Sequence, residues 1–219
     1  MVVEHRFAQL PTIASAVGGW LPPQRGHERP THANGEMMTR MNRDVEPSVE
    51  LRHVVIVAGS LAEWNSFGDE AWRERISAFG KVVEHAGATW LTMRPLDHIH
   101  PPNGGIPASL TRVGRCMGVV DPQTDGRQRL VEAVNVLRRD GRAVTDANLA
   151  EVVNAPSTCD PDLAIVVGPG NELPTTLVWE LAYCELVYLD VPWSDLRGEH
   201  LEAAIAEFAG RHRRFGGLD

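Results

Sequence analysis

The stretch His53–Trp64 reads HVVIVAGSLAEW and indicates how the chain folds. Its opening residues are mostly apolar and β-branched, a pattern typical of a short strand buried on both faces of a parallel sheet. Gly59 and Ser60 then mark a turn. Similar short apolar segments recur at Thr89–Met93, Met117–Val120 and Leu163–Val167. Because amphipathic stretches separate them, we expect an α/β fold with a mostly parallel central sheet flanked by helices.

Apolar positions that recur every three or four residues predict the helices. The predicted ranges are Ala71–His85, Gly126–Asp140, Thr145–Val153, Leu177–Leu186 and Leu201–Arg211. The inner stripe of the second range is expected to consist of Leu130, Val131, Val134 and Leu137. The stretch Pro95–Gly114 is rich in proline and glycine, so we expect an irregular loop there.

The chain has 219 residues, which is enough for one well-buried core. We expect the domain to span residues 51–219 and residues 1–50 to be a disordered or loosely docked N-terminal extension. A formal charge of -8 argues against a nucleic-acid backbone as the main partner. No stretch approaches the roughly 20 apolar residues of a membrane helix, and no secretory signal is visible. A cytoplasmic location is therefore expected.

The three cysteines, Cys116, Cys159 and Cys184, are widely spaced and odd in number. This pattern suggests neither a disulfide framework nor a zinc site, and it favours a reducing compartment. Cys184 lies in the apolar Leu177–Leu186 pattern, so a buried small hydrophobe is a better interpretation than a catalytic thiol.

Ligands of parallel α/β sheets bind outside the carboxyl ends of the strands. This rule directs attention to Ala58–Trp64, Arg94–His100 and Gly168–Thr176. A Gly-Ser turn can offer backbone N–H groups to a phosphate, but the first loop has no GxGxxG pattern and no P-loop lysine. Glu172 would repel an anion at the third loop. Read alone, both loops are better explained as structural turns.

Two further patterns leave alternatives open. Asp97–His100 (DHIH) offers an HxH pair that can ligate zinc if a third ligand lies nearby, and solvated loop histidines are the simpler interpretation. Arg211–Gly217 (RHRRFGG) concentrates positive charge that could clamp a phosphate. The same charge also suits the carboxyl end of a helix. We assign no metal ligand from these patterns.

The C-terminal third carries a family resemblance. PDLAIVVG at Pro161–Gly168, LVWELAYCELVYLDVPW at Leu177–Trp193 and RRFGG at Arg213–Gly217 occur in the order found in undecaprenyl diphosphate synthases and other cis-prenyltransferases. HVVIVAGSLAEW aligns without a gap onto that family's first strand and catalytic loop, and Gly126-Arg127 resembles its GGR segment. The resemblance covers about residues 51–217. It implies a relative of enzymes that condense isopentenyl diphosphate onto an allylic diphosphate with magnesium.

The family's diphosphate chemistry is largely missing. Its catalytic loop reads DGNGRW, where this chain has Gly59 for the aspartate, Leu61 for the asparagine and Glu63 for the arginine. The two arginines and the serine of its second diphosphate site match Val166, Glu172 and Pro174. Each lost charge-assisted contact weakens binding by about 1.5–3 kcal/mol, so the resemblance implies poor diphosphate binding by this chain alone. The retained family positions are Trp64, Arg127, Trp179, Tyr183 and Glu185.

This combination resembles the catalytically degenerate accessory subunits of heteromeric cis-prenyltransferases, such as the Nogo-B receptor. In those subunits a C-terminal Arg-x-Gly reaches into the partner's active site, and Arg214-Phe215-Gly216 matches that pattern. The resemblance implies a catalytic cis-prenyltransferase partner or a homodimer, with Trp179, Tyr183, Leu186 and Tyr188 in or near the interface. It also implies an isoprenoid diphosphate reached through the partner, with magnesium only there, and peripheral membrane attachment through the partner.

Two alternatives stay open at this point. The chain could be an active prenyltransferase with altered or short-chain chemistry, in which Arg94, His98, His100 and Arg127 rebuild a phosphate site. It could also be a binding or regulatory module unrelated to prenyl transfer.

Overall fold

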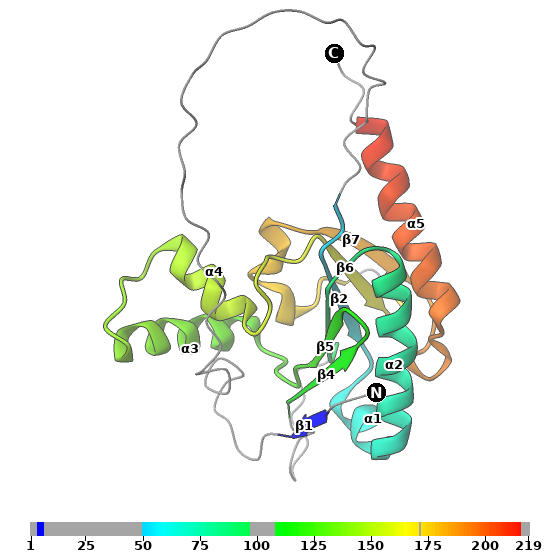
Figure 1. Ribbon diagram of the computed structural model, residues 1–219, viewed down its shortest axis with the longest axis horizontal. Coiled ribbons are helices and arrows are strands. Elements are labelled where there is room, and N and C mark those ends of the chain that lie inside the picture. The colour runs from blue at the N-terminus through cyan, green and yellow to red at the C-terminus, as the bar shows by residue number, and fades with distance from the viewer. Residues whose placement is uncertain (1–3, 7–49, 97–107, 171, 216–219) are drawn as a thin grey trace, which may run out of the picture.

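The centre of the molecule is a seven-stranded sheet in the order β1-β4-β5-β3-β2-β6-β7 (Figure 1). The computed structural model describes residues 4–6, 50–96, 108–170 and 172–215, with the backbone alone at 4–6 and 212–215. Strands β5, β3, β2, β6 and β7 run parallel, whereas β4 is antiparallel to both β5 and β1. The strands are β1 (Glu4–Arg6), β2 (His53–Ala58), β3 (Trp90–Arg94), β4 (Ser109–Val113), β5 (Cys116–Val120), β6 (Leu163–Val167) and β7 (Glu185–Leu189).

Strand β2 is the middle one of the five parallel strands, and all six of its residues are buried. It pairs with β3 on one side and β6 on the other, with Val54 opposite both Leu91 and Leu163. Successive side chains of a strand point to opposite faces of the sheet. Val54 and Ile56 therefore face one apolar cluster, and Val55 and Val57 face another. A strand buried on both faces explains the unbroken apolar run in the sequence.

Helices cover both faces of the sheet (Figure 1). One face is covered by α2 (Asp69–His85) and α5 (Gly198–Phe215), which bury Phe79 and Phe208 in the larger cluster, and α1 (Leu61–Ser66) adds Trp64. The other face is covered by α3 (Gly126–Arg139), α4 (Asp146–Asn154) and two short 3-10 turns, η2 (Thr175–Leu177) and η3 (Glu180–Ala182). A third turn, η4 (Trp193–Asp195), follows β7. The predicted α/β architecture is confirmed.

Three local predictions are wrong. Residues 177–186 do not form an apolar helix: η3 lies there, and β7 begins at Glu185. Consecutive bulky apolar residues are compatible with either a helix or a buried strand. Here, pairing of Glu185–Leu189 with β6 stabilises the strand. Cys184 therefore precedes β7, where it is partly buried and packs against the Val55–Val166 side of the sheet.

The other two corrections concern β4 and α3. Residues 109–113, predicted as irregular loop, form β4 and a tight hairpin with β5, in which Gly114 has φ of 59°. Apolar and polar residues alternate only weakly in this segment, and it forms a strand because it pairs with β5. Val131 does not belong to the inner stripe of α3, because 60% of it is exposed. Ala133, Leu137 and Arg129 occupy the buried side instead.

Of residues 1–50, the structure describes only Glu50 and strand β1, which pairs with β4. The rest of the predicted extension lies outside the described residues. Within the described ranges, no helix combines the length and the apolarity that spanning a membrane requires.

Candidate functional site

The carboxyl ends of the parallel strands meet at one edge of the sheet, where a ligand site is expected. Gly59 follows β2, Arg94 ends β3, Asp121 follows β5 and Gly168 follows β6. Two clusters occupy this edge. One is an aromatic cluster around the Gly59 loop, and the other is a buried network of ion pairs centred on Glu180.

The backbone at Gly59 leaves no room for a side chain. Its φ of 65° lies in the left-handed region that favours glycine. A Cβ added at this position would lie 2.7 Å from both Cγ and Cδ1 of Trp193. The position that matches the family's catalytic aspartate is therefore filled by an indole ring that packs directly on the main chain.

The turn that follows is hydrogen-bonded to its own side chains. Ser60 is the N-cap of α1, and its Oγ accepts a hydrogen bond of 3.1 Å from the Glu63 amide. The Glu63 carboxylate in turn accepts hydrogen bonds from the Ser60 amide at 2.7 Å and from its hydroxyl at 2.9 Å. This capping box satisfies amides that a bound phosphate would otherwise use. Glu63, at the position of the family's arginine, therefore places a negatively charged carboxylate where an anion would bind.

Aromatic rings close the space beside this loop. Trp64 is fully buried and donates from Nε1 to the Ala58 carbonyl at 2.8 Å. The Trp64 ring lies 4.9 Å from that of Trp72 and 6.1 Å from that of Trp193. The Arg75 guanidinium stacks 4.2 Å from the Trp193 ring centroid and donates to the Trp193 carbonyl at 2.7 Å. The retained Trp64 is thus part of a packed core.

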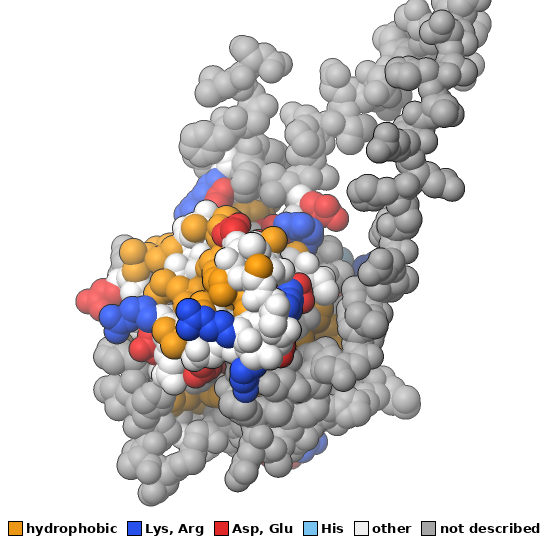
Figure 2. Space-filling model, turned by 90° about the vertical axis from the view of Figure 1, so that its left-hand side faces the viewer, with side chains coloured by type: hydrophobic (Ala, Val, Ile, Leu, Met, Phe, Trp, Pro, Cys, Tyr) orange, Lys and Arg blue, Asp and Glu red, His pale blue; other side chains and the backbone are white. Residues whose placement is uncertain are grey.

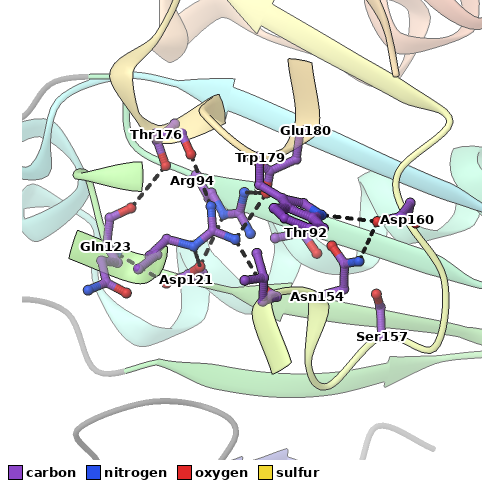
Figure 3. Close-up of polar contacts among 12 residues, drawn as sticks. Thr92, Arg94, Asp121, Gln123, Asn154, Ser157, Asp160, Thr176, Trp179 and Glu180 are labelled. Carbon is purple, nitrogen blue, oxygen red and sulfur yellow. Dashed lines mark hydrogen bonds and ion pairs between the residues drawn. The ribbon is translucent and has the colours of Figure 1, made fainter. Parts of the chain in front are cut away.

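The second cluster, here called the Glu180 network, consists of Arg94, Asp121, Arg129 and Glu180. Figure 3 labels Arg94, Asp121 and Glu180. Both Arg94 Nη1 and Arg129 Nη2 donate to Glu180 Oε1, the latter at 3.0 Å. Arg94 Nε also donates to Asp121 Oδ2 at 3.0 Å. Arg129 donates further to the carbonyls of Thr176 and Val153 at 3.0 and 3.1 Å. Four charged side chains of balanced sign are buried together.

The electrostatics of the Glu180 network follow from this packing. Burial by itself raises the pKa of Glu180, but the two arginines outweigh it and hold the pKa at about 2. Burial likewise lowers the pKa of Arg94, yet Glu180 and Asp121 outweigh it and the pKa is raised. Glu180 and Arg94 are therefore both charged at neutral pH. Arg94 is fully engaged within the fold and cannot serve a phosphate from solution.

A neutral polar cluster continues from this network toward the start of β2. His53 Nδ1 lies 3.2 Å from the Cys159 carbonyl oxygen, so this nitrogen must carry the proton, and Nε2 accepts from Thr92 Oγ1 at 2.9 Å. Burial lowers the pKa of His53 to about 4. Asp160 Oδ1 accepts hydrogen bonds from Asn154 Nδ2 at 2.6 Å and from Trp179 Nε1 at 3.2 Å (Figure 3).

The three positions that match the family's second diphosphate site do not converge. Val166 is a buried strand residue that packs in the smaller apolar cluster. Glu172 is exposed in the loop after β6, and Pro174 is buried at the start of η2. None offers a donor to an anion.

The retained family positions serve separate contacts. Arg127 is exposed at the start of α3, with Nε 3.7 Å from Asp125 Oδ1. Trp179 packs against Tyr183 with ring centroids 5.6 Å apart. Glu185 lies 3.9 Å from Arg211. The side chains of Arg214 and Phe215, together with Gly216, Asp97, His98 and His100, lie outside the described residues.

The residues at the Gly59 loop do not fit a magnesium ion. Gly59 supplies no carboxylate, and the Glu63 carboxylate accepts two hydrogen bonds from Ser60. Across the described part of the chain, no group of three or more His, Cys, Asp or Glu side chains could hold a metal. The thiols are also unsuited to nucleophilic chemistry, since burial raises the pKa of Cys116 and of Cys184 to about 12.

The sequence reading missed the Glu180 network and the position of Trp193. A signal was present in each case: Arg129 interrupts the inner side of α3, Glu180 interrupts the apolar run LVWELAY, and Asp121 directly follows a strand. Charged residues at such positions must be paired or exposed. Their partners come from distant segments, so the pairing itself could not be read.

Comparison with known proteins finds relatives for the C-terminal part of the chain. Residues 120–216 match the model of a family described as "Putative undecaprenyl diphosphate synthase". An isoprenyl transferase 2 of Bradyrhizobium diazoefficiens is 43% identical over 91 residues, which is 42% of this chain and 36% of that protein. A (2E,6E)-farnesyl-diphosphate-specific ditrans,polycis-undecaprenyl-diphosphate synthase of Lactiplantibacillus plantarum is 45% identical over 76 residues, 35% of this chain and 29% of that protein.

The curated relatives are thus matched over about a third of their length. Over more of the fold, the chain resembles the crystal structure of lavandulyl diphosphate synthase from Lavandula x intermedia. The TM-score is 0.53 at 13% identity, and the match covers 74% of this chain and 96% of that one. Sequence similarity in the C-terminal part supports the cis-prenyltransferase family, and the structural match shows the fold alone.

Proposed function

We propose that this chain, with its cis-prenyltransferase-like C-terminal part and fold, is a non-catalytic accessory subunit that supports polyprenyl diphosphate synthesis by a catalytic partner. The observation that carries the proposal is the Gly59–Trp193 contact. An aspartate at position 59 would need both a left-handed backbone and the volume of the indole. The chain has therefore lost the space for the catalytic group as well as the group itself.

The charge pattern at the loop supports the same proposal. The Glu63 carboxylate accepts a hydrogen bond from the Ser60 amide at the start of α1, where an anion would otherwise bind. A diphosphate at that place would meet a negative side chain instead of the family's arginine. Because Arg94 is held by Glu180 and Asp121, and Arg129 by Glu180, neither of these buried arginines compensates for it.

A docking face for the partner lies over α3, α4 and the 3-10 turns. Figure 2 views this side of the molecule, on which hydrophobic side chains gather among arginines. The exposed apolar residues of this region are Val131, Val144, Val178, Leu181 and Tyr183, each at least 40% exposed. Val178 lies against the start of α3, and the Tyr183 hydroxyl lies 3.5 Å from Asp146 Oδ1, so these elements form one surface. Contiguous exposed apolar surface of this kind marks protein–protein contact.

The occupant we propose is a cis-prenyltransferase subunit with an intact DGNGRW loop. Trp179 is fixed beneath the face by Asp160 and so presents Tyr183 in a set orientation. Leu186 and Tyr188, which were expected near the interface, lie partly buried on β7 and pack inward. Arg214, which lies in the last turn of α5 and belongs to the Arg214-Phe215-Gly216 pattern, would donate hydrogen bonds to a diphosphate in the partner's site. Magnesium would be bound there by the partner and the substrate.

Reconstitution with such a subunit from the same genome tests the proposal. The purified complex is expected to incorporate labelled isopentenyl diphosphate at a rate well above that of the partner alone. Arg214→Ala is expected to lower this rate without preventing assembly, whereas Arg213→Ala, its neighbour outside the Arg-x-Gly pattern, serves as the control. Equal activity of the wild-type and Arg214→Ala complexes would remove the donor role.

The docking face has its own test. Leu181→Asp, at a position 40% exposed, is expected to abolish co-purification with the partner. Lys81→Asp, which places the same side chain at an exposed position of α2 on the other side of the sheet, is expected to leave it unchanged. Retention of the complex by the Leu181 variant would place the interface elsewhere.

A further inference from the structure

We propose that Arg94 and Arg129 form a carboxylate-binding site at the carboxyl edge of the sheet, and that Glu180 fills it as an internal ligand. The proposal goes beyond the accessory role and does not depend on it. It assigns a site that would take a small planar oxyanion such as acetate once the Glu180 side chain is removed.

The two arginines converge on one point from different elements. Arg94 ends β3, and Arg129 lies on the inner side of α3. Their guanidinium groups meet at a single oxygen, Glu180 Oε1. Both are at least 94% buried, at 4% and 6% exposure. A pair of desolvated guanidinium groups aimed at one position is the arrangement that recognises carboxylates and phosphates.

The arginines are held in place by groups other than Glu180. Asp121 accepts from Arg94 Nε at 3.0 Å, and the carbonyls of Thr176 and Val153 accept from Arg129 at 3.0 and 3.1 Å. These contacts would persist if the Glu180 carboxylate were absent. The site is therefore built from the sheet and α3 and does not require its present occupant for its geometry.

Glu180 occupies the site imperfectly. Its Oε1 accepts hydrogen bonds from both arginines, while its Oε2 is buried with no hydrogen-bond partner among the described residues. A carboxylate free to orient itself could use both oxygens, since arginine pairs favour bidentate contact. Glu180 differs from a free carboxylate because its side chain is attached to the main chain of the three-residue η3 turn. The unpaired Glu180 Oε2 is thus consistent with a carboxylate that is covalently attached to the chain and cannot orient itself freely.

Removal of Glu180 would also leave a charge that attracts an anion. Arg94 and Arg129 carry two positive charges, and Asp121 would offset only one of them. An uncompensated buried cation is strongly unfavourable. Binding of one carboxylate from solution would restore both neutrality and the hydrogen bonds, and it would stabilise the folded state by mass action.

Chemical rescue of the full chain carrying Glu180→Ala tests the site. Its melting temperature is expected to rise by several degrees, at about 2–4 °C for each kcal/mol of stabilisation, as acetate replaces chloride at constant ionic strength. Pivalate, which has the same charge but is too bulky for a cavity the size of the Glu side chain, is expected to have no such effect. Wild-type protein and Glu151→Gln, which removes a carboxylate from a surface pair with Arg142, are expected to be insensitive to acetate.

If Glu180→Ala is unfolded in chloride, its refolding yield across the acetate series replaces the melting temperature as the readout. Recovery of the native circular dichroism spectrum with acetate, and not with pivalate, supports the site. A variant that responds equally to both anions, or to neither, overturns it, as does an equal response of the wild-type protein. Because no partner or isoprenoid is present, this result is independent of the accessory-subunit proposal.

Discussion

The two faces of the sheet are buried in different ways. Against α2 and α5 the sheet meets aliphatic and aromatic side chains, with Phe79, Trp193 and Phe208 in one apolar cluster. Against α3 and the 3-10 turns it meets the Glu180 network and the polar cluster of His53. The apolar face tolerates approximate packing, whereas each group of the polar face requires a specific partner. The carboxyl edge of the sheet, where a ligand site was predicted, is therefore occupied by the protein's own side chains.

Among the variants that still fold, the greatest loss of stability should come from disrupting the polar face. Arg94→Met leaves Glu180 and Asp121 buried with Arg129 alone, and it is expected to lower the free energy of unfolding by about 3–5 kcal/mol. Urea unfolding followed by circular dichroism measures the change. Arg142→Met, which removes a surface ion pair with Glu151, is the control and is expected to cost less than about 1 kcal/mol. Similar losses for both variants would show that burial of the network contributes little.

The pH dependence of stability probes the same face. The pKa of His53 is about 4 in the folded chain and near 6.5 when unfolded, so the unfolded state binds the additional proton between these values. Stability from this group is fully present above about pH 6.5 and falls as the pH drops toward 4, by about 3 kcal/mol in total.

The measurement is the free energy of unfolding from urea titrations at pH 7.5 and pH 5. His53→Gln should reduce the slope, because it removes the titrating group. The folded-state depression of Glu180 acts mainly below the unfolded carboxyl range, so it adds little above pH 5. An identical slope in the His53 variant would contradict the assignment.

The sequence predicted the apolar face more completely than the polar one. The strand at His53–Ala58 and the helix at Asp69–His85 have a clear period, because one side of each is uniformly apolar. The run at residues 177–186 has no such contrast, since Leu177 packs inward while Val178 and Leu181 are exposed and Glu180 is buried. Helical periodicity is recognised on the assumption that charged residues are exposed, and the buried Glu180 violates that assumption. Its arginine partners are 86 and 51 residues away in the sequence, so no local pattern reveals them.

The candidate site was predicted in part. The sequence placed Gly59 and Glu63 in a loop after a buried strand; Gly59 lies there, whereas Glu63 lies in the first turn of α1. It could not place Trp193 against Gly59, because that contact joins segments far apart in the chain and depends on how β7 is followed by η4. A contact such as that of Trp193 with Gly59, between residues far apart in the chain, produces no recognisable pattern in the local sequence.

A smaller effect is expected at the boundary between the two faces, at Gly59. Gly59→Ala is expected to cost about 1–2 kcal/mol for its positive φ and a further cost from the clash with Trp193. Gly141→Ala, which has a φ of 67° and no atom within 4 Å of its added Cβ, measures the backbone cost alone. The difference between the two melting temperatures therefore reports the Trp193 contact. Equal changes would mean that the indole moves aside freely.

The smallest effect is expected on the exposed side of α3. Val131→Lys should change the free energy of unfolding by no more than about 0.5 kcal/mol, because 60% of the residue is exposed. Leu137→Lys, one turn and a half along the same helix, is fully buried and should prevent folding. Urea unfolding of the first variant and solubility of the second test this assignment of the two sides.

The most direct measurement is turnover by the purified chain without any partner. Labelled isopentenyl diphosphate is supplied with dimethylallyl, geranyl or farnesyl diphosphate and magnesium, and products are separated by chain length. Because Trp193 fills the space at Gly59 and the Glu63 carboxylate lies at the start of α1, we expect no elongated product above background. Elongation by the isolated chain at a rate ordinary for an enzyme would contradict the account.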